Sequence, residues 1–336
     1  MDRSQLSEHL QNFRNKHILV IGDVMLDRFI WGNVTRISPE APVPVVEVTR
    51  DDYYPGGAAN VARNLIHFAD KVSVMGRAGT DTDGDQLMAL LEAQCLDNSG
   101  ILRDAELPTT VKTRVIALHQ QVVRIDQEKR ARLSDRMLED AVAHIESRLD
   151  SIDAIILQDY GKGFITQELV DRIAGLNGIS RIPITVDPNP SNPINWKGAM
   201  AVKPNRHEAF KVADLPETLI GKNPAEDTTV RSLAEALFSK WDTSLLLITL
   251  GEQGMAVCER ADADAEMKIS HIPSRAREVY DVSGAGDTAI ALFTLALASG
   301  LSPHDAAEVS NYASAVVVGK LGTATLSAEE LLDSIS

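Results

Sequence analysis

The chain has 336 residues, of which 44% are hydrophobic, so it can bury a large core, and its ordinary glycine and proline contents exclude a collagen-like or disordered chain. The formal net charge of −15 disfavours nucleic acid and anionic membranes as partners, because an acidic surface repels both. Any phosphorylated substrate must therefore be held by a local group of donors that acts against the global charge.

Cys95 and Cys258 are the two cysteines, and they form neither a Cys-x-x-Cys pair nor a Cys/His cluster. A disulfide framework and a zinc site are therefore not expected, and reduced thiols are typical of the cytoplasm. Residues 1–16 are polar and contain no apolar signal core. The longest apolar run, 289–298, is too short to span a bilayer, so we expect a cytoplasmic protein without a membrane partner.

Short apolar strands alternate with helical segments along most of the chain, which indicates a mostly parallel sheet with right-handed crossovers. The expected strands cover residues 17–21, 45–48, 72–75, 154–157, 184–186, 199–202 and 245–249, with 255–258 and 268–272 antiparallel. The expected helices cover residues 56–68, 84–93, 166–174, 206–212, 230–238, 284–299 and 303–320.

Residues 110–126 break this alternation, because they are rich in β-branched side chains and lack helical spacing. This pattern predicts a β-hairpin that leaves the core. Together with residues 31–50, which we expect to be a polar stretch followed by a strand, the hairpin would form a small sheet that covers a site. Residues 1–336 would then form a single α/β domain with a β lid.

The most specific motif is the turn Asp281-Val-Ser-Gly-Ala-Gly-Asp-Thr-Ala289, which precedes an apolar helical segment. The backbone N–H groups of Gly284, Ala285 and Gly286 at a helix start suit an anion such as a transferring phosphate. Asp287 beside them could take the proton of an attacking hydroxyl, although a carboxylate at a helix start is also a common cap. We expect this turn to face a cleft that holds a nucleotide and a sugar together.

The same turn fits the dinucleotide pattern Gly-x-Gly-x-x-Ala, with Asp305 at a plausible distance for a ribose contact. Too little chain follows for a dinucleotide-binding half, and Asp287 would repel a pyrophosphate, so a dehydrogenase is disfavoured. The sequence has no Gly-x-x-x-x-Gly-Lys-[Ser/Thr] motif, which excludes a P-loop NTPase, and it lacks the protein-kinase motifs.

A second motif, Gly56-Gly57-Ala-Ala-Asn60, opens an expected helix. Paired glycines let a ligand approach the backbone closely, and Asn60 offers both a donor and an acceptor, as sugar hydroxyls require. A plain tight turn with a solvated Asn is an equally good interpretation.

Two motifs follow expected strands, where ligands of open α/β sheets bind. Thr249-Leu-Gly251-Glu-Gln-Gly254 permits close approach of a nucleotide, or forms only a hairpin turn. In Lys203-Pro-Asn-Arg-His-Glu208, the last residue could hold Mg²⁺ through water, or it could be the capping-box partner of Asn205.

Two shorter stretches, Asp187-Pro-Asn189 and Asp159-Tyr-Gly-Lys-Gly163, also follow expected strands. Lys162 between glycines is a candidate phosphate contact, and a solvated loop lysine is an equally good interpretation.

Residues 56–64 and 281–288 resemble the paired signatures of the PfkB/ribokinase family of carbohydrate kinases, although Val282-Ser283 stands where the family has a consensus Thr. The resemblance extends over nearly the whole chain through Gly22-Asp23 with Asp27 and through the motifs at 203–208 and 249–254. It implies a ribokinase-like three-layer sandwich with a mostly parallel central sheet and a small β-sheet lid. It also implies ATP as phosphoryl donor, with Mg²⁺.

Finer features resemble the heptose 7-phosphate kinases within this family. They are residues 37–46, residues 159–163, Gln120-Gln121 with residues 124–126, and Gly322-Thr-Ala-Thr325. The resemblance implies phosphorylation of O1 of D-glycero-β-D-manno-heptose 7-phosphate, a step toward ADP-heptose for the lipopolysaccharide core. In that branch the kinase is often fused to an adenylyltransferase domain, so we expect a stand-alone kinase or the kinase half of a bifunctional protein.

The resemblance also implies a role for each motif. Asp287 would receive the proton of the anomeric hydroxyl, and the anion hole would be formed by Gly284, Ala285 and Gly286. The expected nucleotide contacts are Asn205, Arg206, His207, Glu208, Thr249, Gly251 and Gly254, with Glu208 holding Mg²⁺ through water. The expected sugar contacts are Asp27, Gly56, Gly57 and Asn60, and the candidates for the 7-phosphate are Lys112, Arg114, Arg124 and Lys162.

The apolar face of the two lid segments needs cover, which predicts a homodimer with lid-to-lid contact. Two alternatives stay open on the sequence. One is another sugar kinase of the same fold, similar to a ribokinase or a fructokinase. The other is a non-catalytic module that senses a sugar or a nucleotide.

Overall fold

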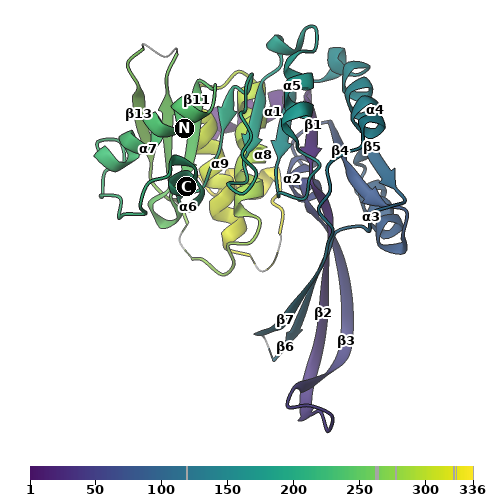
Figure 1. The fold of residues 1–336 in the computed structure, drawn as a ribbon. Helices are drawn as coiled ribbons and strands as arrows, with labels where there is room; N and C mark the ends of the chain where they lie inside the picture. The colour runs from purple at the N-terminus through teal and green to yellow at the C-terminus, as the bar shows by residue number, and fades with distance from the viewer. Residues whose placement is uncertain (119, 262–264, 277, 321, 323, 336) are drawn as a thin grey trace.

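A nine-stranded sheet forms the centre of the molecule in the computed structural model, which describes residues 1–118, 120–261, 265–276, 278–320, 322 and 324–335 (Figure 1). The strand order is β13-β12-β11-β10-β9-β8-β1-β4-β5. The strands are β1 (His17–Gly22), β4 (Lys71–Gly79), β5 (Asp97–Asp104), β8 (Ala154–Gln158), β9 (Ile184–Asp187), β10 (Ala201–Val202), β11 (Leu245–Thr249), β12 (Met255–Glu259) and β13 (Lys268–Ile272). All neighbours pair in parallel except β11/β12 and β12/β13, which are antiparallel as expected.

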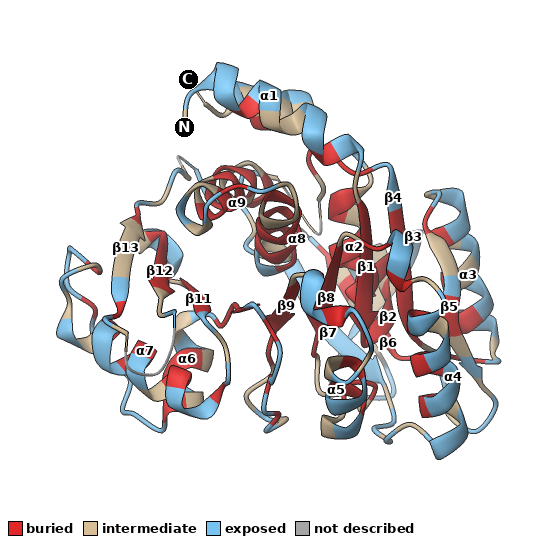
Figure 2. Ribbon diagram, turned by 90° about the horizontal axis from the view of Figure 1, so that it is seen from above, coloured by how far each residue is buried: buried red, intermediate tan, exposed pale blue. Residues whose placement is uncertain are grey.

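Helices cover both faces of this sheet, which makes the expected three layers (Figure 2). One layer contains α1 (Arg3–Arg14), α2 (Ala58–Leu65), α3 (Thr82–Ala93), α8 (Ala285–Ala298), α9 (Pro303–Val318) and α10 (Ala328–Asp333). The other contains α4 (Asp135–Glu146), α5 (Gln167–Ala174), α6 (Arg206–Ala213) and α7 (Thr228–Lys240). Strand β1 shows why: Ile18 and Val20 face the first core, Leu19 and Ile21 the second, so both faces of the sheet are apolar.

A separate four-stranded sheet projects from the body as the lid, with the order β3-β2-β6-β7 (Figure 1). Its strands are β2 (Val24–Ile37), β3 (Pro44–Gly57), β6 (Val111–Ala117) and β7 (Gln120–Gln127). The expected hairpin is present as the antiparallel pair β6/β7, and residue 119 at its turn lies outside the described residues.

Two sequence expectations need correction here. Residues 31–37 are part of a strand and not of a loop, because β2 continues for fourteen residues from Val24 and pairs with β3 along its length. Gly56 and Gly57 end β3 and do not belong to the helix, which begins at Ala58 and ends at Leu65. The lid therefore extends beyond residues 31–50 at both ends, and the glycine pair lies at its hinge with the core.

Within the part of the chain that the structure describes, no helix is long and apolar enough to cross a membrane. Thr323 of the stretch that begins at Gly322 lies outside that part.

Candidate active site

Polar side chains gather where several parallel strands of the central sheet end. Gln158 ends β8, Asp187 ends β9, and Lys203 follows β10. All three are buried, with exposed fractions of 2%, 9% and 3%. Because the carboxyl ends of parallel strands meet at one edge of a sheet, residues that are far apart in sequence form one polar cluster there.

Asp287, in the first turn of α8, carries the carboxylate at the centre of this cluster. Its Oδ2 accepts a hydrogen bond of 2.7 Å from Nδ2 of Asn60, which belongs to α2. Its Oδ1 accepts hydrogen bonds of 2.8 Å from the hydroxyl of Tyr160 and 3.4 Å from Nε2 of Gln158. A second contact, from Oγ1 of Thr288 to Oδ1 of Asn64 at 2.8 Å, fixes α8 against α2. The structure thus unites the two motifs that carry the family resemblance.

The turn before Asp287 has the geometry of an anion site. Gly284 is the N-cap of α8 with φ of 82°, a left-handed conformation that favours glycine. Among the described residues, the backbone N–H groups of Gly284, Gly286 and Asp287 have no hydrogen-bond acceptor, whereas the N–H of Ala285, which we expected to be part of the anion hole, donates to the carbonyl oxygen of Val282 at 3.2 Å. A Cβ built on Gly286 would lie 3.6 Å from Nζ of Lys203, so an ammonium group is close to the same helix end. Free N–H groups, the helix dipole and a lysine all favour a negative charge here.

Lys203 is held in place by a buried ion pair, with Nζ 3.1 Å from Oδ1 of Asp187. The other oxygen of Asp187 accepts a hydrogen bond of 3.1 Å from Nε2 of Gln158. The ion pair offsets the burial of both side chains, because an unpaired buried charge would be strongly unfavourable.

Burial away from water raises the pKa of Asp287 to about 6. This value is a net result: the nearby Asp187 also raises the pKa, whereas the hydrogen bonds from Asn60 and Tyr160 and the charge of Lys203 lower it. A carboxylate with a pKa just below neutral is mostly charged at pH 7 and still able to accept a proton, which suits a general base.

One expectation about Asp287 is not met, because its carboxylate does not open onto a cleft. The residue is only 7% exposed, and the Tyr160 hydroxyl and the Asn60 amide occupy its two oxygens. A cavity of about 860 Å³ lies nearby, but it is lined by residues such as Arg132, Thr166 and Asn192 on the other side of the 161–166 loop. The first-turn position of Asp287 was predictable, whereas its cover by a tyrosine from another loop was not.

The glycine pair and Asp27 lie at the hinge of the lid. Gly57 has φ of 60° and ψ of −133°, and a Cβ there would be 2.3 Å from the carbonyl oxygen of Asp23. Gly57 therefore requires glycine, whereas a Cβ on Gly56 would be 2.3 Å from Oδ2 of Asp27 and would displace that side chain. The buried Asp27 forms an ion pair with Arg114 across the lid.

Asp23 has a structural role. Its buried carboxylate accepts hydrogen bonds from the backbone N–H groups of Tyr160 at 3.0 Å, Lys162 at 2.9 Å and Phe164 at 3.0 Å. It therefore fixes the loop that carries Tyr160 over Asp287.

Of the four candidates for binding a sugar phosphate, Arg114 pairs with Asp27, and the other three side chains have different partners. Lys112 lies 5.8 Å from the ring centroid of Tyr160, and burial together with the charge of Lys162 lowers its pKa. Lys162 pairs with Glu128. The Arg124 side chain lies on the exposed strand β7 and forms a bidentate pair with Asp126 at 2.9 and 3.0 Å. Lys112 and Lys162 therefore flank Tyr160, whereas Arg124 lies farther out on the lid.

The expected nucleotide residues lie at the ends of β10 and β11. Asn205 is the N-cap of α6 and forms a capping box with Glu208, so the capping interpretation of that pair is confirmed. The side chains of Arg206 and His207 lie at 3.4 and 3.1 Å from Glu217 and are engaged with the loop that follows α6.

The turn after β11 lies beside this helix start. Thr249 forms an isolated parallel bridge with Asn205. Gly251 and Gly254 have φ of 62° and 88°, and a Cβ on Gly254 would be 2.0 Å from the carbonyl oxygen of Ile272. The turn therefore depends on glycine for its shape, and it joins β11 to β12 as a hairpin.

The described residues contain no group of three or more His, Cys, Asp or Glu that could hold a metal ion. Mg²⁺ usually binds through one or two carboxylates and the phosphates of a substrate, and it keeps several waters. Glu208 meets this description: burial and the charge of Asp187 raise its pKa, so a cation held there would favour the charged carboxylate. These two residues fit a water-mediated Mg²⁺.

Three residues of the cluster received no role from the sequence. Tyr160, Gln158 and Lys203 each adjoin the end of an expected strand, and this position was the available signal. Position alone did not distinguish them from solvated loop residues, because their contacts with the 284–287 turn depend on how the strands are ordered in the sheet.

Residues 15–331 match the family model described as pfkB family carbohydrate kinase. The chain is 37% identical over 335 residues to the bifunctional protein HldE of Geobacter metallireducens, covering 100% of this chain and 66% of that protein. It is 41% identical over 323 residues to the bifunctional protein HldE of Magnetococcus marinus, covering 95% of this chain and 64% of that protein. The chain thus spans about two thirds of the length of these relatives.

Solved structures support the same fold. The ribokinase of Thermotoga maritima matches with a TM-score of 0.71 at 20% identity, covering 95% of this chain and 99% of that one. Phosphofructokinase-2 of Escherichia coli, in complex with potassium, matches with a TM-score of 0.72 at 17% identity, covering 95% and 98%. The expected ribokinase-like fold is therefore confirmed. The chain belongs to the pfkB family of carbohydrate kinases, and it is a phosphotransferase that uses ATP as donor and an alcohol group of a sugar as acceptor.

Proposed function

We propose that this kinase phosphorylates O1 of D-glycero-β-D-manno-heptose 7-phosphate to the 1,7-bisphosphate, a step toward ADP-heptose for the lipopolysaccharide core. The observation that carries the reaction is the position of Asp287, with a pKa of about 6, between Asn60 and a helix end with free N–H groups. The choice of heptose rests on the four stretches that resemble heptose 7-phosphate kinases, and the HldE relatives are consistent with it.

In this proposal, Asp287 receives the proton of the anomeric hydroxyl while O1 attacks the γ-phosphoryl of ATP in line. The N–H groups of Gly286 and Asp287, together with Lys203, stabilise the charge on the transferring group. Tyr160 must withdraw its hydroxyl from Asp287 to admit the sugar. The lid, by closing over the sugar, would exclude water and limit hydrolysis of ATP.

The remaining motifs hold the two substrates. The triphosphate would lie along the start of α6 at Asn205, with the nucleotide flanked by the turn of Thr249, Gly251 and Gly254. Mg²⁺ would be held through water by Glu208 and Asp187, and it would neutralise charge on the phosphates. Arg206 and His207 remain in our proposed set, although reaching a nucleotide requires them to leave Glu217.

Sugar hydroxyls would be bound by Asn60, Asp27 and the glycine pair at the hinge. Lys112 and Lys162 are the first candidates for the 7-phosphate, because Lys112 lies beside Tyr160 and its pKa is lowered by burial and by the nearby charge of Lys162. Arg114 and Arg124 on the lid would add to this charge when the lid closes.

We infer that residues 1–336 form one kinase domain, with the lid as a part of it, and that the enzyme works in the cytoplasm as a homodimer through the lid. Exposed apolar side chains on the lid support the dimer, with exposed fractions of 46% for Val123 and 56% for Ile125. Such side chains on an edge strand are usually covered by a partner.

The test of the substrate is an assay of ADP release with heptose 7-phosphate, ribose, fructose and fructose 6-phosphate. We expect the highest kcat/KM with heptose 7-phosphate and a selective loss for phosphorylated sugars in Lys112→Ala. Preference for ribose or fructose would assign a ribokinase-like or fructokinase-like function. Release of no ADP with any sugar would favour a sensing module.

A further inference from the structure

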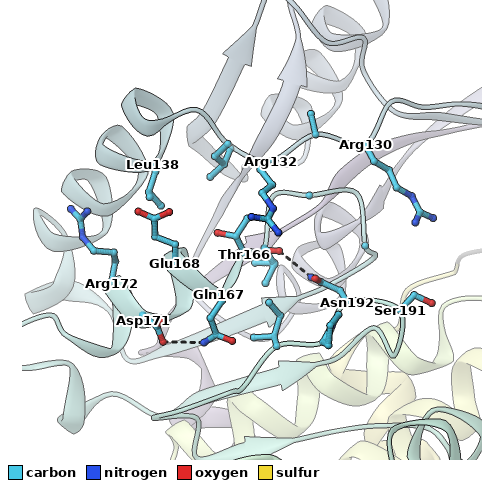
Figure 3. A pocket seen from close by; sticks show the side chains of 17 residues that line it. Arg130, Arg132, Leu138, Thr166, Gln167, Glu168, Asp171, Arg172, Ser191 and Asn192 are labelled. Atoms are coloured by element: carbon cyan, nitrogen blue, oxygen red, sulfur yellow. Dashed lines mark hydrogen bonds between the residues drawn. The ribbon is translucent and has the colours of Figure 1, made fainter.

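The cavity of about 860 Å³ lies behind the loop that covers Asp287 (Figure 3). This is within the size range of small-molecule sites. Its walls are the segment 130–133, the loop 161–168 with the first turns of α5, and the segment 191–194. Apolar side chains of Leu138, Ile165 and Ile194 line part of it.

Three exposed arginines line this cavity in a chain with a net charge of −15, together with two carboxylates, Glu168 and Asp171. Figure 3 shows Arg132 over its middle, near Thr166 and Asn192, with Arg172 at one end and Arg130 at the other. Within the described ranges, no carboxylate lies within ion-pair distance of any of these three guanidinium groups, although many other arginines of the chain are paired.

The backbone of the segment that carries Arg132 is held in place by hydrogen bonds from Arg77. Arg77 donates hydrogen bonds to the carbonyl oxygens of Ala131 at 2.7 Å and Arg132 at 3.3 Å. Gly163, with φ of 102°, lets this segment lie against the loop, because a Cβ there would be 2.2 Å from the Ala131 carbonyl oxygen. The arginine therefore projects from a backbone that is already ordered, which reduces the entropy lost on binding an anion.

The opposite wall is bonded to the loop over the active site. Nδ2 of Asn192 donates to Oδ2 of Asp159 at 2.9 Å and to the carbonyl oxygen of Ile165 at 3.0 Å. Oδ1 of Asp159 accepts a hydrogen bond of 2.7 Å from the N–H of Gly161. The residue between Asp159 and Gly161 is Tyr160, so the two faces of one short loop line the cavity and cover Asp287.

We propose that this cavity is a regulatory site for a small phosphorylated metabolite, whose phosphate binds Arg132 and accepts a hydrogen bond from the hydroxyl of Thr166. A phosphate ester suits the site because guanidinium groups bind it through paired hydrogen bonds, and the apolar wall can contact its organic part. A ligand held between Arg132 and Thr166 joins the 130–133 segment to the loop that carries Tyr160 and stabilises that loop on Asp287, so its binding lowers turnover.

The regulatory effect rests on the proposed function of Asp287, whereas binding itself does not, so binding is measured separately. The full chain, labelled with ¹⁵N, is titrated with inorganic phosphate, glycerol 3-phosphate and ADP in three experiments. The amide signals of residues 166–167 and 191–192 report the cavity, and those of residues 284–287 report the catalytic site. Arg132→Gln removes the central cation, and Arg136→Gln removes the same charge from the exposed face of α4 as the matched control.

We expect saturable shifts at 166–167 and 191–192 whose Kd rises about tenfold or more in Arg132→Gln and stays unchanged in Arg136→Gln. Stronger binding of an ester than of phosphate assigns the ligand as a metabolite, and the reverse assigns free phosphate. The tightest probe should also lower kcat in the wild type and not in Arg132→Gln. Shifts confined to 284–287, or an equal loss in both variants, would overturn the proposal.

Discussion

Tyr160 and Asp287 show how the site combines opposing effects on one carboxylate. Burial raises the pKa of Asp287, and hydrogen bonds from Tyr160 and Asn60 hold the rise to about 6. If Asp287 acts as the base, it must be deprotonated, so kcat/KM should fall as the pH drops through about 6.

The Tyr160 hydroxyl tests this balance directly. Tyr160→Phe removes a donor that favours the charged carboxylate, so the pKa of Asp287 should rise. We expect the acid limb of the kcat/KM profile to move upward by about one pH unit, since a hydrogen bond to a charged group contributes roughly 1.5–3 kcal/mol and one unit is about 1.4 kcal/mol.

Tyr280→Phe is the matched control, because Tyr280 is exposed and its hydroxyl contacts Glu278. Its profile should coincide with that of the wild type. An unchanged acid limb in Tyr160→Phe would show that the profile does not report Asp287, or that the hydroxyl does not contact it in solution.

At the scale of elements, the hinge between β3 and α2 depends on one backbone conformation. Gly57→Ala would place a Cβ 2.3 Å from the Asp23 carbonyl oxygen at a positive φ, and Asp23 holds the Tyr160 loop. We expect the free energy of unfolding to fall by about 3 kcal/mol or more in urea denaturation, since both strain and overpacking contribute.

Gly300→Ala separates these two causes. Gly300 also has a positive φ, of 86°, but no atom lies within 4 Å of a Cβ built there. The free energy of unfolding of Gly300→Ala should fall only by the cost of the positive φ, about 1 kcal/mol. Equal losses in the two variants would contradict the close packing described for Gly57.

The elements that the sequence predicted well are those buried in the core. Strands such as β1 and β11 are continuous apolar runs, and their length and flanking glycines locate them. Strand β2 was missed because its outer half, from Trp31 onward, lies in the lid and mixes polar with apolar residues. Helix α4 also has a signal in the sequence, because Ser134 caps it and the apolar residues Leu138, Ala141 and Ile145 share its buried face.

The sequence predicts those site residues that belong to a short continuous motif. The 284–287 turn and the 56–60 stretch carry their own signals, although their contact joins residues 227 positions apart. Lys203 and Tyr160 reach Asp287 only because β8, β9 and β10 are neighbours in the sheet. The order of strands is a property of the whole fold, so no local pattern could have assigned these two roles.

At the scale of the whole molecule, the lid is the part that a single chain leaves uncovered. All residues of β7 are exposed, and Val123 and Ile125 present apolar side chains from this edge strand. We expect a dimer by light scattering at micromolar concentration, and dissociation to monomers in the double variant Val123→Glu/Ile125→Glu, because buried like charges oppose association.

Leu219→Glu is the control for added charge, because Leu219 is 88% exposed in the segment between α6 and α7, outside the lid. It should leave the mass unchanged. A wild-type mass of one chain, or a dimer that persists in the double variant, would contradict a dimer interface formed by the lid.

The most direct test of the account is the turnover of Asp287→Asn with ATP and heptose 7-phosphate, with Asp140→Asn on the exposed face of α4 as control. The account predicts a kcat lowered by about 10²–10⁴-fold with the fold retained, because an amide cannot accept the proton of the attacking hydroxyl. The control should keep its full rate. Near-normal turnover in Asp287→Asn, with a normal acid limb, would contradict the assignment of Asp287 as the base.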